Sequence, residues 1–522
     1  MTSPDGLLLS IDCGTQSVRA LLFDARGELV GRAQEPLRDY SVPQPGWHEH
    51  DGEGFWRAAA RACQSLWQQD PAWRRAVRGA AVTTQRATLV PTDRDGRCLR
   101  PAITWLDQRR ASELPRIGLQ WRLLFSVLGF GGALRHFTRE AEVNWLAQHE
   151  PELHRAAHKY LLVSGLLNQR LTGRFVDSVG SQVGYLPFDF KRLRWAAPRD
   201  WKWQALDVRA DQMPDLAPVG SVLGEVTTTA AESTGIPAGT PVIAAAADKA
   251  CEILGSGALT PQIGALSYGT TATINVTTAR YFEAAAGNPA YPAAVPTHYS
   301  VEVQIFRGYW MVNWFKEQFG HPERAAATRL GVTPETLFDE MVGTVPPGSM
   351  GLTLQPYWSP GVRQPGPDAK GAVIGFGDVH TRAHLYRAIL EGLAYALREG
   401  RERIERRGHT RLTELRVSGG GSQSDAAMQL TADVFNLPTA RPHTHETSGL
   451  GAAIDCAVGL GMHREFPDAV AAMTRVGRVF EPVPANVATY DALYERVYRP
   501  MYGRLKPLYR EIQRITGYPA LP

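Results

Sequence analysis

The chain has 522 residues, 44% of them hydrophobic, and its 56 Lys and Arg residues nearly balance its 52 Asp and Glu residues, which gives a formal net charge of +4. This length predicts about two to four domains, and the balanced charge excludes a basic arm for nucleic acid. The five cysteines are scattered and form neither a C-x-x-C motif nor a Cys/His metal pattern, which suits a reducing compartment. We therefore expect a cytoplasmic globular protein with no nucleic-acid partner.

The N-terminal part of the chain predicts strands joined by tight turns. An apolar run at 7–12 stops at the polar segment CGTQS, and the strand pattern resumes at 18–24 and again at 29–32 after the turn DARGE. Apolar residues at helical spacing follow at 54–69 and near 140–148. Strands followed by helices predict an α/β fold.

The nearly uncharged stretch LLFSVLGFGGAL at 123–134 permits two interpretations. It has about a dozen residues, and a bilayer span takes roughly twenty, so we expect no membrane segment there. It is either a buried core segment or a surface for self-association. The N-terminus MTSPDGLLLSID has no basic region before a long apolar stretch, so we expect no signal peptide.

The first strand pattern is repeated in the second half of the chain. The segment 236–259 predicts a strand, a polar stop at Asp248 and a short helix, and after Gly264 a strand again meets a Gly-Thr turn in SYGTTATINV. A long amphipathic helix within 381–408 and a strand, glycine turn and helix at 415–435 follow. We expect two domains of common design, 1–257 and 258–522.

The two Gly-Thr turns predict phosphate binding. A strand that stops at glycine and a small hydroxyl residue exposes several backbone N–H groups, which bind anions. No Walker motif occurs, and no G-x-G-x-x-G follows a strand. Either turn alone could be a plain hairpin, but two turns with Asp12 directly before the first suggest a polyphosphate and an associated Mg²⁺. Arg19 could reach a phosphate or could be an ordinary strand arginine.

Asp248 and a triple glycine complete the candidate chemistry. Asp248 ends a strand and begins a helix, where it is either a helix N-cap or the base that takes a hydroxyl proton during phosphoryl transfer. The glycines of SGGGSQSD at 418–425 allow the backbone to approach a flat ligand such as adenine, or they form a helix-entry turn without a ligand.

With these stretches in this order, the chain resembles the FGGY carbohydrate kinases, which share the actin and hexokinase ATPase core. The resemblance extends over essentially the whole length. It rests on DCGTQSVRALLFD, PGWHEHD, TTQRATLVPTDRDGRCLRPAITWLDQRRA, AAADKACEILGSGA, SYGTTATINV, GAVIGFGDVHTRAHLYRAILEGLAYALREG and VSGGGSQSDAAMQLTADVF with ETSGLGAAIDCAVGLG. It implies two ribonuclease-H-like domains around a central cleft and ATP-dependent phosphorylation of a small sugar, such as a pentulose, or a polyol.

Carried over residue by residue, the resemblance assigns roles to positions of this chain. Asp248 would be the catalytic base and Asp12 the Mg²⁺-associated carboxylate. Residues near ATP would be Thr15, Gln16, Arg19, Gly269, Thr270, Thr271, Gly308, Asn313, Gly420, Gly421 and Ser424. Residues of the sugar site would be Gln85, Arg86, Trp105 and Asp107.

Two positions depart from the better-known relatives. Ala87 stands where glycerol kinases carry a glutamate and xylulokinases a histidine, and a methyl group cannot hydrogen-bond a hydroxyl, which disfavours glycerol and xylulose as the preferred acceptor. Lys249 follows the catalytic aspartate where glutamine or alanine is commoner, and it either favours an acidic or phosphate-proximal group of the substrate or points to solvent. The runs DKACE and QPYW are most similar to uncharacterised bacterial FGGY sugar kinases.

A different class of function stays open at this stage. The actin-like ATPase core also serves nucleotide-gated regulatory and binding proteins without sugar kinase activity. Such a protein would need neither Asp248 nor the segment WLDQRR at 105–110, and both are present. The sequence does not set the oligomeric state, for which a homodimer is the alternative to a monomer.

Overall fold

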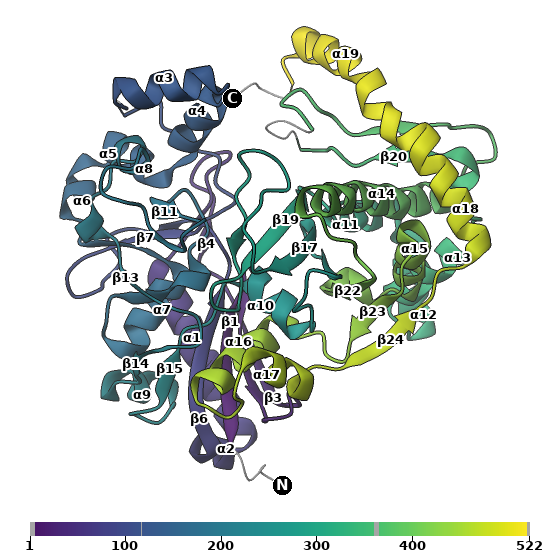
Figure 1. Ribbon diagram of the computed structural model, residues 1–522. Helices are drawn as coiled ribbons and strands as arrows, with labels where there is room; N and C mark the ends of the chain where they lie inside the picture. Colours follow the sequence, from purple (N-terminus) through teal and green to yellow (C-terminus); the bar gives the residue numbers. More distant parts are fainter. Residues whose placement is uncertain (1–5, 116, 360–364, 519–522) are drawn as a thin grey trace.

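Two mixed β-sheets form the centres of two domains in the computed structural model, which describes residues 6–115, 117–359 and 365–518 (Figure 1). The expectation of no signal peptide falls partly on residues 1–5, outside the described residues. In spatial order, the first sheet contains β14 (Val222–Glu225), β15 (Pro241–Ile243), β6 (Val77–Thr84), β1 (Leu7–Cys13), β2 (Ser17–Phe23) and β3 (Leu29–Pro36).

The second sheet has the same pattern of parallel and antiparallel strand pairs from one edge to the other. Its strands are β24 (Val476–Phe480), β23 (Thr439–Pro442), β22 (Glu414–Ser418), β16 (Ile263–Tyr268), β17 (Ala272–Thr278) and β19 (Tyr299–Ile305), with β18 (Tyr291–Pro292) added beyond β19. In both sheets the successive pairs are antiparallel, parallel, parallel, antiparallel and antiparallel. The predicted α/β fold with two domains of common design is confirmed, while the bounds 1–257 and 258–522 stay a prediction.

The first domain carries a large insertion beside its sheet. A five-stranded sheet there contains β4 (Tyr40–Ser41), β5 (Glu49–His50), β8 (Ala102–Ile103), β7 (Leu89–Thr92) and β9 (Lys159–Leu162). Two strand pairs are β10 (Val176–Ser178) with β13 (Asp215–Ala217), and β11 (Phe188–Asp189) with β12 (Arg194–Trp195). The helices of this half are α1 (Gly52–Gln69), α2 (Pro71–Ala76), α3 (Leu119–Val127), α4 (Gly131–Glu140), α5 (Glu142–His149), α6 (Pro151–Ala156), α7 (Val163–Thr172), α8 (Lys202–Ala205), α9 (Thr228–Thr234) and α10 (Asp248–Gly255).

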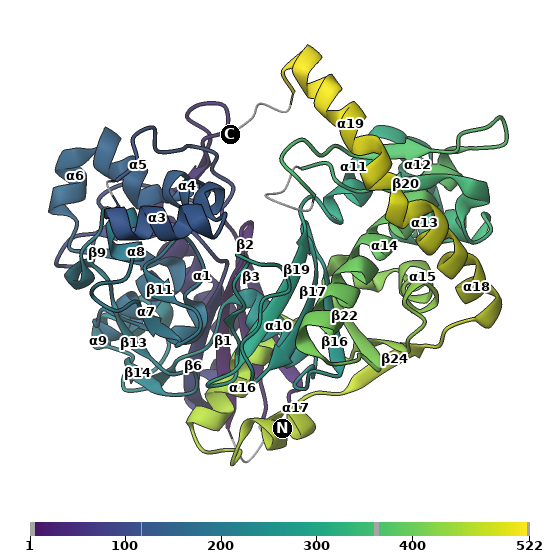
Figure 2. The ribbon, with the colours of Figure 1, turned by 45° about the horizontal axis from the view of Figure 1, so that its top comes forward.

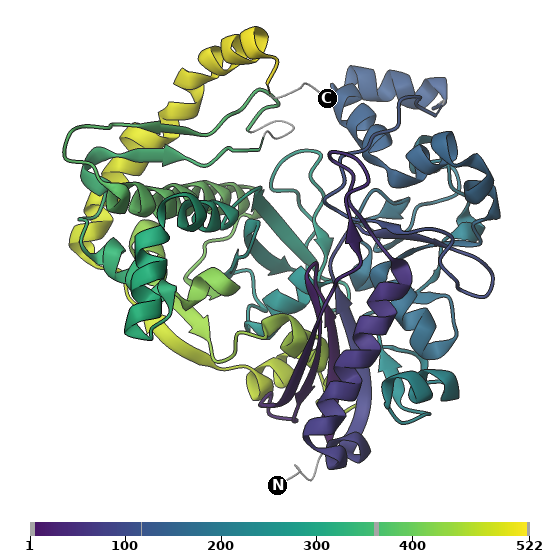
Figure 3. The ribbon, with the colours of Figure 1, turned by 180° about the vertical axis from the view of Figure 1, so that it is seen from behind.

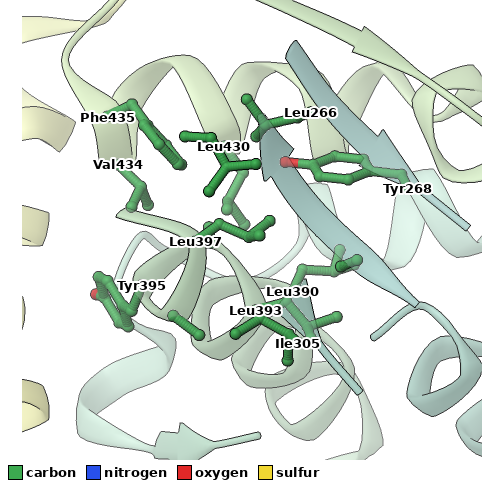
Figure 4. Packing of buried hydrophobic residues seen from close by; sticks show 14 of the residues in the cluster. Leu266, Tyr268, Ile305, Leu390, Leu393, Tyr395, Leu397, Leu430, Val434 and Phe435 are labelled. Carbon is green, nitrogen blue, oxygen red and sulfur yellow. The ribbon is translucent and has the colours of Figure 1, made fainter. Parts of the chain in front are cut away.

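Helices also make up much of the second half of the chain. They are α11 (Trp310–Phe319), α12 (His321–Leu330), α13 (Pro334–Gly343), α14 (Arg382–Gly408), α15 (Asp425–Phe435), α16 (Thr447–Gly459), α17 (Phe466–Met473), α18 (Pro484–Leu493) and α19 (Arg499–Thr516), with the hairpin β20 (Thr353–Gln355) and β21 (Ala372–Ile374). Leu390, Leu393 and Leu397 of α14 point toward Leu266 and Ile305 of the sheet (Figure 4). The apolar stripe of the predicted long helix therefore forms the core of this domain.

The apolar stretch 123–134 is not a core segment. It covers the end of α3 and the start of α4, and α3 has no buried residue. Leu123 is 58% exposed and Val127 is 85% exposed, while Phe125 packs edge-on against Trp201 at 5.2 Å between ring centroids. The interpretation as a buried segment is wrong, because only one edge of this short helix meets the rest of its domain.

The two domains exchange helices at their junction. In β1, Leu7, Leu9 and Ile11 pack in the cluster that contains α1, which covers the outer face of the first sheet (Figure 3). Leu8, on the opposite face, packs in the cluster that contains α16, although α16 follows the strands of the second domain. Conversely, Glu252 of α10 bonds to the strands β16 and β22 of the second sheet. The helices α10 and α16 thus lie between the sheets (Figure 2).

The helices α10 and α16 touch through their backbones. A Cβ atom on Gly255 would lie 2.0 Å from the carbonyl oxygen of Thr447, and a Cβ atom on Gly451 would lie 2.0 Å from that of Cys251. The crossing is therefore symmetric, because each glycine faces the carbonyl of the partner helix four residues before the partner's own glycine. Only glycine permits this approach at both points.

Replacing Gly451 with Ala is expected to destabilise the protein by about 2 kcal/mol or more, because an added Cβ would collide with backbone that cannot rotate away. The matched control is Gly503→Ala in α19, where an added Cβ meets nothing within 4 Å. That change should be neutral or should stabilise by up to about 1 kcal/mol. Denaturant unfolding measures both. A Gly451→Ala variant as stable as the control variant would contradict the crossing.

Candidate active site

The first Gly-Thr turn joins β1 to β2 and carries a buried acid. Asp12 is 4% exposed, and its Oδ2 accepts from Arg19 at 3.1 Å. Arg19 also donates to Glu446 at 3.3 Å, so it is engaged with two carboxylates. Burial raises the pKa of Asp12 to about 7, Arg19 opposes the rise, and the negative charges of Asp248, Glu446 and Glu252 add to it. Glu446 directly precedes α16, so both domains supply this cluster.

The second Gly-Thr turn joins β16 to β17 and is braced by the start of α11. The backbone N–H of Tyr309 donates to the carbonyl of Gly269 at 3.1 Å, and the next residue donates to Thr270 at 3.4 Å. A Cβ atom on Gly308 would lie 2.2 Å from the backbone nitrogen of Ala272. Close packing on the turn therefore requires glycine at position 308. A contact between Gly308 and the nucleotide stays a prediction.

Asp248 is the first residue of α10 and follows the β15 strand. Its Oδ1 accepts from the backbone N–H of Lys249 at 2.7 Å. Burial raises the pKa of Asp248, while the positive charges of Lys249 and Arg86 oppose the rise. A carboxylate held in this way remains available as a base, and it lies at the junction of the two domains.

A hydrogen-bond chain links the first turn to the predicted sugar segment. Trp105 donates from Nε1 to Thr15 Oγ1 at 3.0 Å, and Thr15 donates to Gln85 Oε1 at 3.3 Å. Gln85 is 4% exposed, and its backbone N–H donates to the carbonyl of Cys13 at 2.9 Å. Three of the predicted site residues are therefore brought together at the carboxyl ends of β1 and β6.

Arg86 is paired across the domain junction with a residue that the sequence analysis missed. Its two terminal nitrogens donate to Glu302 of β19, each at 3.2 Å, and its guanidinium lies 5.3 Å from the ring centroid of Tyr291. A small pocket adjoins it, lined by Arg86, Val183, Ala247, Lys249, Ala250, Tyr291, Pro292 and Ser300. Both domains therefore form the wall beside the predicted base.

Ala87 and Asp107 have structural features that the resemblance did not reveal. Ala87 has a φ of 51°, in the left-handed region that is uncommon for alanine. Asp107 accepts from the guanidinium of Arg109 at 2.8 Å and from the backbone N–H of His48 at 2.7 Å. The Asp107 carboxylate is thus engaged within the insertion of the first domain, and a role in acceptor binding stays a prediction.

The predicted adenosine residues lie near the second turn. Gly420 has open space around its Cα, whereas a Cβ on Gly421 would lie 2.3 Å from the ring of Tyr309. Ser424 caps α15 by accepting from Ala427, and it donates to Asp339 at 2.5 Å. Two other predicted nucleotide residues, Gln16 and Asn313, have exposed side chains. Gly420 therefore has room for a flat ligand, whereas Gly421 is required by close packing on Tyr309.

The residues fit an Mg²⁺ ion held largely by water and phosphate. Within 6–115, 117–359 and 365–518, no three or more His, Cys, Asp or Glu side chains gather to hold a metal ion by themselves. Nucleotide sites commonly hold Mg²⁺ through one or two carboxylates, several waters and the phosphates. The buried Asp12 carboxylate, whose ionisation is opposed by three neighbouring acids, suits that arrangement.

Comparison with known proteins gives the class. Residues 7–255 match the N-terminal domain of the FGGY family of carbohydrate kinases, and residues 264–460 match its C-terminal domain. The chain therefore belongs to the FGGY family of carbohydrate kinases. It is a phosphotransferase with an alcohol group as acceptor, which uses ATP to phosphorylate a sugar or polyol. Nothing in these matches supports the nucleotide-gated regulatory alternative.

Individual relatives cover nearly the whole chain. A xylulose kinase of Staphylococcus epidermidis is 28% identical over 518 residues, with 98% of this chain and 99% of the relative covered. A glycerol kinase of Dechloromonas aromatica is also 28% identical, with 92% and 94% covered. The crystal structure of a xylulose kinase from Rhodospirillum rubrum has a TM-score of 0.78 at 27% identity, covering 97% of this chain and all (100%) of that chain.

None of the helices in the described part of the chain combines the length and the apolar character needed to cross a bilayer.

The site residues that the sequence analysis missed are Glu252, Ser267, Tyr291, Glu302 and Glu446. Glu252 stands four residues after Asp248, so helical spacing alone places both on one side of α10. Glu302 alternates with apolar residues in its strand and reads as an outward-facing residue. Its partner Arg86 lies 216 positions earlier, and no local pattern could reveal that pairing.

Replacing Asp12 with Asn is expected to stabilise the metal-free protein increasingly from pH 5 to pH 8. The pKa of Asp12 lies at about 7 in the folded protein against an ordinary 3.8. Folded protein therefore binds more protons than the unfolded chain between these values, and its stability falls as the pH rises through that window. At about 1.4 kcal/mol for each pH unit, the loss above pH 7 is on the order of 4 kcal/mol.

Urea unfolding with a chelator present measures this effect. The control is Asp95→Asn, whose side chain is 72% exposed and whose substitution should change the free energy of unfolding by no more than about 0.5 kcal/mol. An Asp12→Asn difference that is flat from pH 5 to pH 8 would disprove the buried, destabilised carboxylate.

Proposed function

We propose that this kinase transfers the γ-phosphoryl group of Mg²⁺-bound ATP to a hydroxyl of a neutral polyhydroxylated acceptor, a ketose such as a pentulose or a polyol, with Asp248 as the base. The observation that carries the proposal is the position of Asp248. It starts α10 at the junction of the two domains, beside a pocket whose walls come from both. Burial also raises the pKa of Asp248, which makes its carboxylate a stronger proton acceptor.

The transfer needs the two Gly-Thr turns and the acceptor to face one another. The backbone N–H groups of the turns would bind the phosphates, with Thr15, Gln16 and Arg19 on one side and Gly269, Thr270 and Thr271 on the other. When bound through Asp12, Mg²⁺ would neutralise charge on the phosphates. As the acceptor oxygen bonds to phosphorus, Asp248 would take its proton and ADP would leave.

The charges beside the pocket favour a neutral acceptor. Arg86 is held by Glu302 in a two-bonded pair, and Lys249 is held by Glu252 at 2.8 Å. With Asp248 included, three carboxylates face two cations, so an anionic acceptor would meet net repulsion. The unused N–H groups of Arg86 remain suited to hydroxyl oxygens.

Replacing Asp248 with Asn is expected to lower kcat by about 10² to 10⁴-fold, because an amide cannot accept the hydroxyl proton. Affinity for ATP should change little, because Asp248 would act on the acceptor hydroxyl and not on the nucleotide. Acceptor-dependent ADP release measures the rate, and calorimetric titration measures ATP binding. Turnover within threefold of the parent would refute Asp248 as the base.

A screen of acceptors is expected to show ADP release with neutral ketopentoses, ketohexoses, pentitols or erythritol, and at least tenfold lower kcat/KM with the aldonic acid of the same carbon number. The carboxylates of Glu302 and Glu252 beside the pocket would repel the carboxylate of such an acid. Glu302→Gln removes one negative charge, so it should reduce the difference in kcat/KM between the neutral acceptor and the acid. An acid preferred by the unmodified protein would overturn the neutral-acceptor proposal and leave the kinase class untouched.

A further inference from the structure

Lys249 does not point to solvent, and its ammonium lies at the second phosphate turn. Its Nζ donates to Glu252 Oε2 at 2.8 Å and to Ser267 Oγ at 2.5 Å. A Cβ atom on Gly269 would lie 3.9 Å from the same Nζ. The residue that follows the candidate base in sequence therefore reaches across the junction to the turn of the other domain.

The ammonium is held by a buried carboxylate that is itself anchored. Glu252 is 7% exposed and accepts from Ser267 at 2.9 Å and from Ser418 at 2.6 Å. Burial acts to raise the pKa of Glu252, but Lys249 and the two serines hold the pKa below its ordinary value. Burial acts to lower the pKa of Lys249, but Glu252 and Asp248 outweigh it and raise that pKa. Both partners are therefore charged.

One N–H of the ammonium is left over for a ligand. A lysine ammonium has three donors, and Glu252 and Ser267 take two of them. Lys249 also lines the pocket that contains Arg86, Tyr291 and Ser300. The donor thus lies between the turn that would hold the end of ATP and the carboxylate that would receive the acceptor proton.

We propose that Lys249 is a further catalytic residue, which donates a hydrogen bond to a non-bridging oxygen of the transferring phosphoryl group. The inference rests on the proposed function. In the step, the bond from the γ-phosphorus to the β,γ-bridging oxygen breaks, and the acceptor oxygen bonds to the phosphorus. The acceptor proton passes to Asp248, ADP leaves, and Lys249 keeps its own proton throughout.

Glu252 is a positioning residue in this arrangement. It is not among the residues that line the pocket, and it acts by holding the ammonium on the strands β16 and β22. Because Glu252 lies on α10 while those strands belong to the second sheet, the ammonium stays aligned with both the base and the turn. A fixed donor costs no reorganisation as charge develops on the phosphoryl oxygens.

The rival interpretation is purely structural, with Lys249 and Glu252 only fastening α10 to the second sheet. Lys249→Gln and Lys249→Arg separate the two, because Arg keeps a charged donor and Gln does not. Lys202→Gln is the control, since Lys202 is a similarly buried lysine of the first-domain insertion, 3.5 Å from Asp200. It should retain the parent rate.

For Lys249→Gln we expect kcat to fall by about 10² to 10³-fold, as for the loss of one transition-state donor, with KM for the acceptor and Kd for ADP within about threefold of the parent. Lys249→Arg should keep at least a tenth of the rate. The second readout is binding of ADP with Mg²⁺ and aluminium fluoride, which imitates the transferring group. Lys249→Gln should weaken this complex at least tenfold, and Glu252→Gln should weaken it less.

Two results would overturn the inference: a Lys249→Gln rate close to that of the parent, or a lower melting temperature with unchanged aluminium fluoride binding. Failure of the proposed function has a different signature, because the unmodified protein would then release no ADP with any acceptor. The aluminium fluoride complex tests Lys249 in that case as well, since it needs no acceptor.

Discussion

The backbone contact between α10 and α16 is the constraint on which the site depends. Gly255 and Gly451 let each helix lie directly against a carbonyl of the other, so no side chain is available to adjust the crossing. The starts of the two helices are thereby fixed. Asp248 begins α10, and Glu446 directly precedes α16. The contact between the two helix backbones therefore determines where the carboxylates of Asp248 and Glu446 lie.

Charge is concentrated at this junction, and most of it is paired between domains. Arg86 with Glu302 and Arg19 with Glu446 each join one residue from either half. The burial of Asp12 is only partly compensated by Arg19, and its pKa is raised to about 7. A site of this kind stores unfavourable free energy in the empty protein, which a divalent cation and its phosphates can release on binding. The burial that opposes the ionisation of Asp12 would therefore also contribute to the affinity for Mg²⁺.

Local patterns predicted the fold and the acids at strand ends. Alternating and apolar runs predicted β1, β2 and β3, the repeated Gly-Thr turn predicted the second sheet, and the polar stop at Asp248 predicted α10. What they could not predict lies in contacts between distant segments. Glu302 and Glu446 act on residues of the other half of the chain, and the apolar character of α3 indicated burial where the structure has exposure. The hydrophobicity of a segment shows that it could be buried, but the tertiary packing decides whether another surface covers it.

The exchange of α10 and α16 limits how freely the two halves could be recombined. Each half keeps its own sheet, but a charged residue beside its Gly-Thr turn comes from the other half: Lys249 contacts Ser267, and Glu446 contacts Arg19. A chimera joined at the seam near residue 260 from two distant relatives would therefore fold its sheets and still mismatch both helix starts. The two halves of this kinase share one architecture, but each half must fit the helix that the other half supplies.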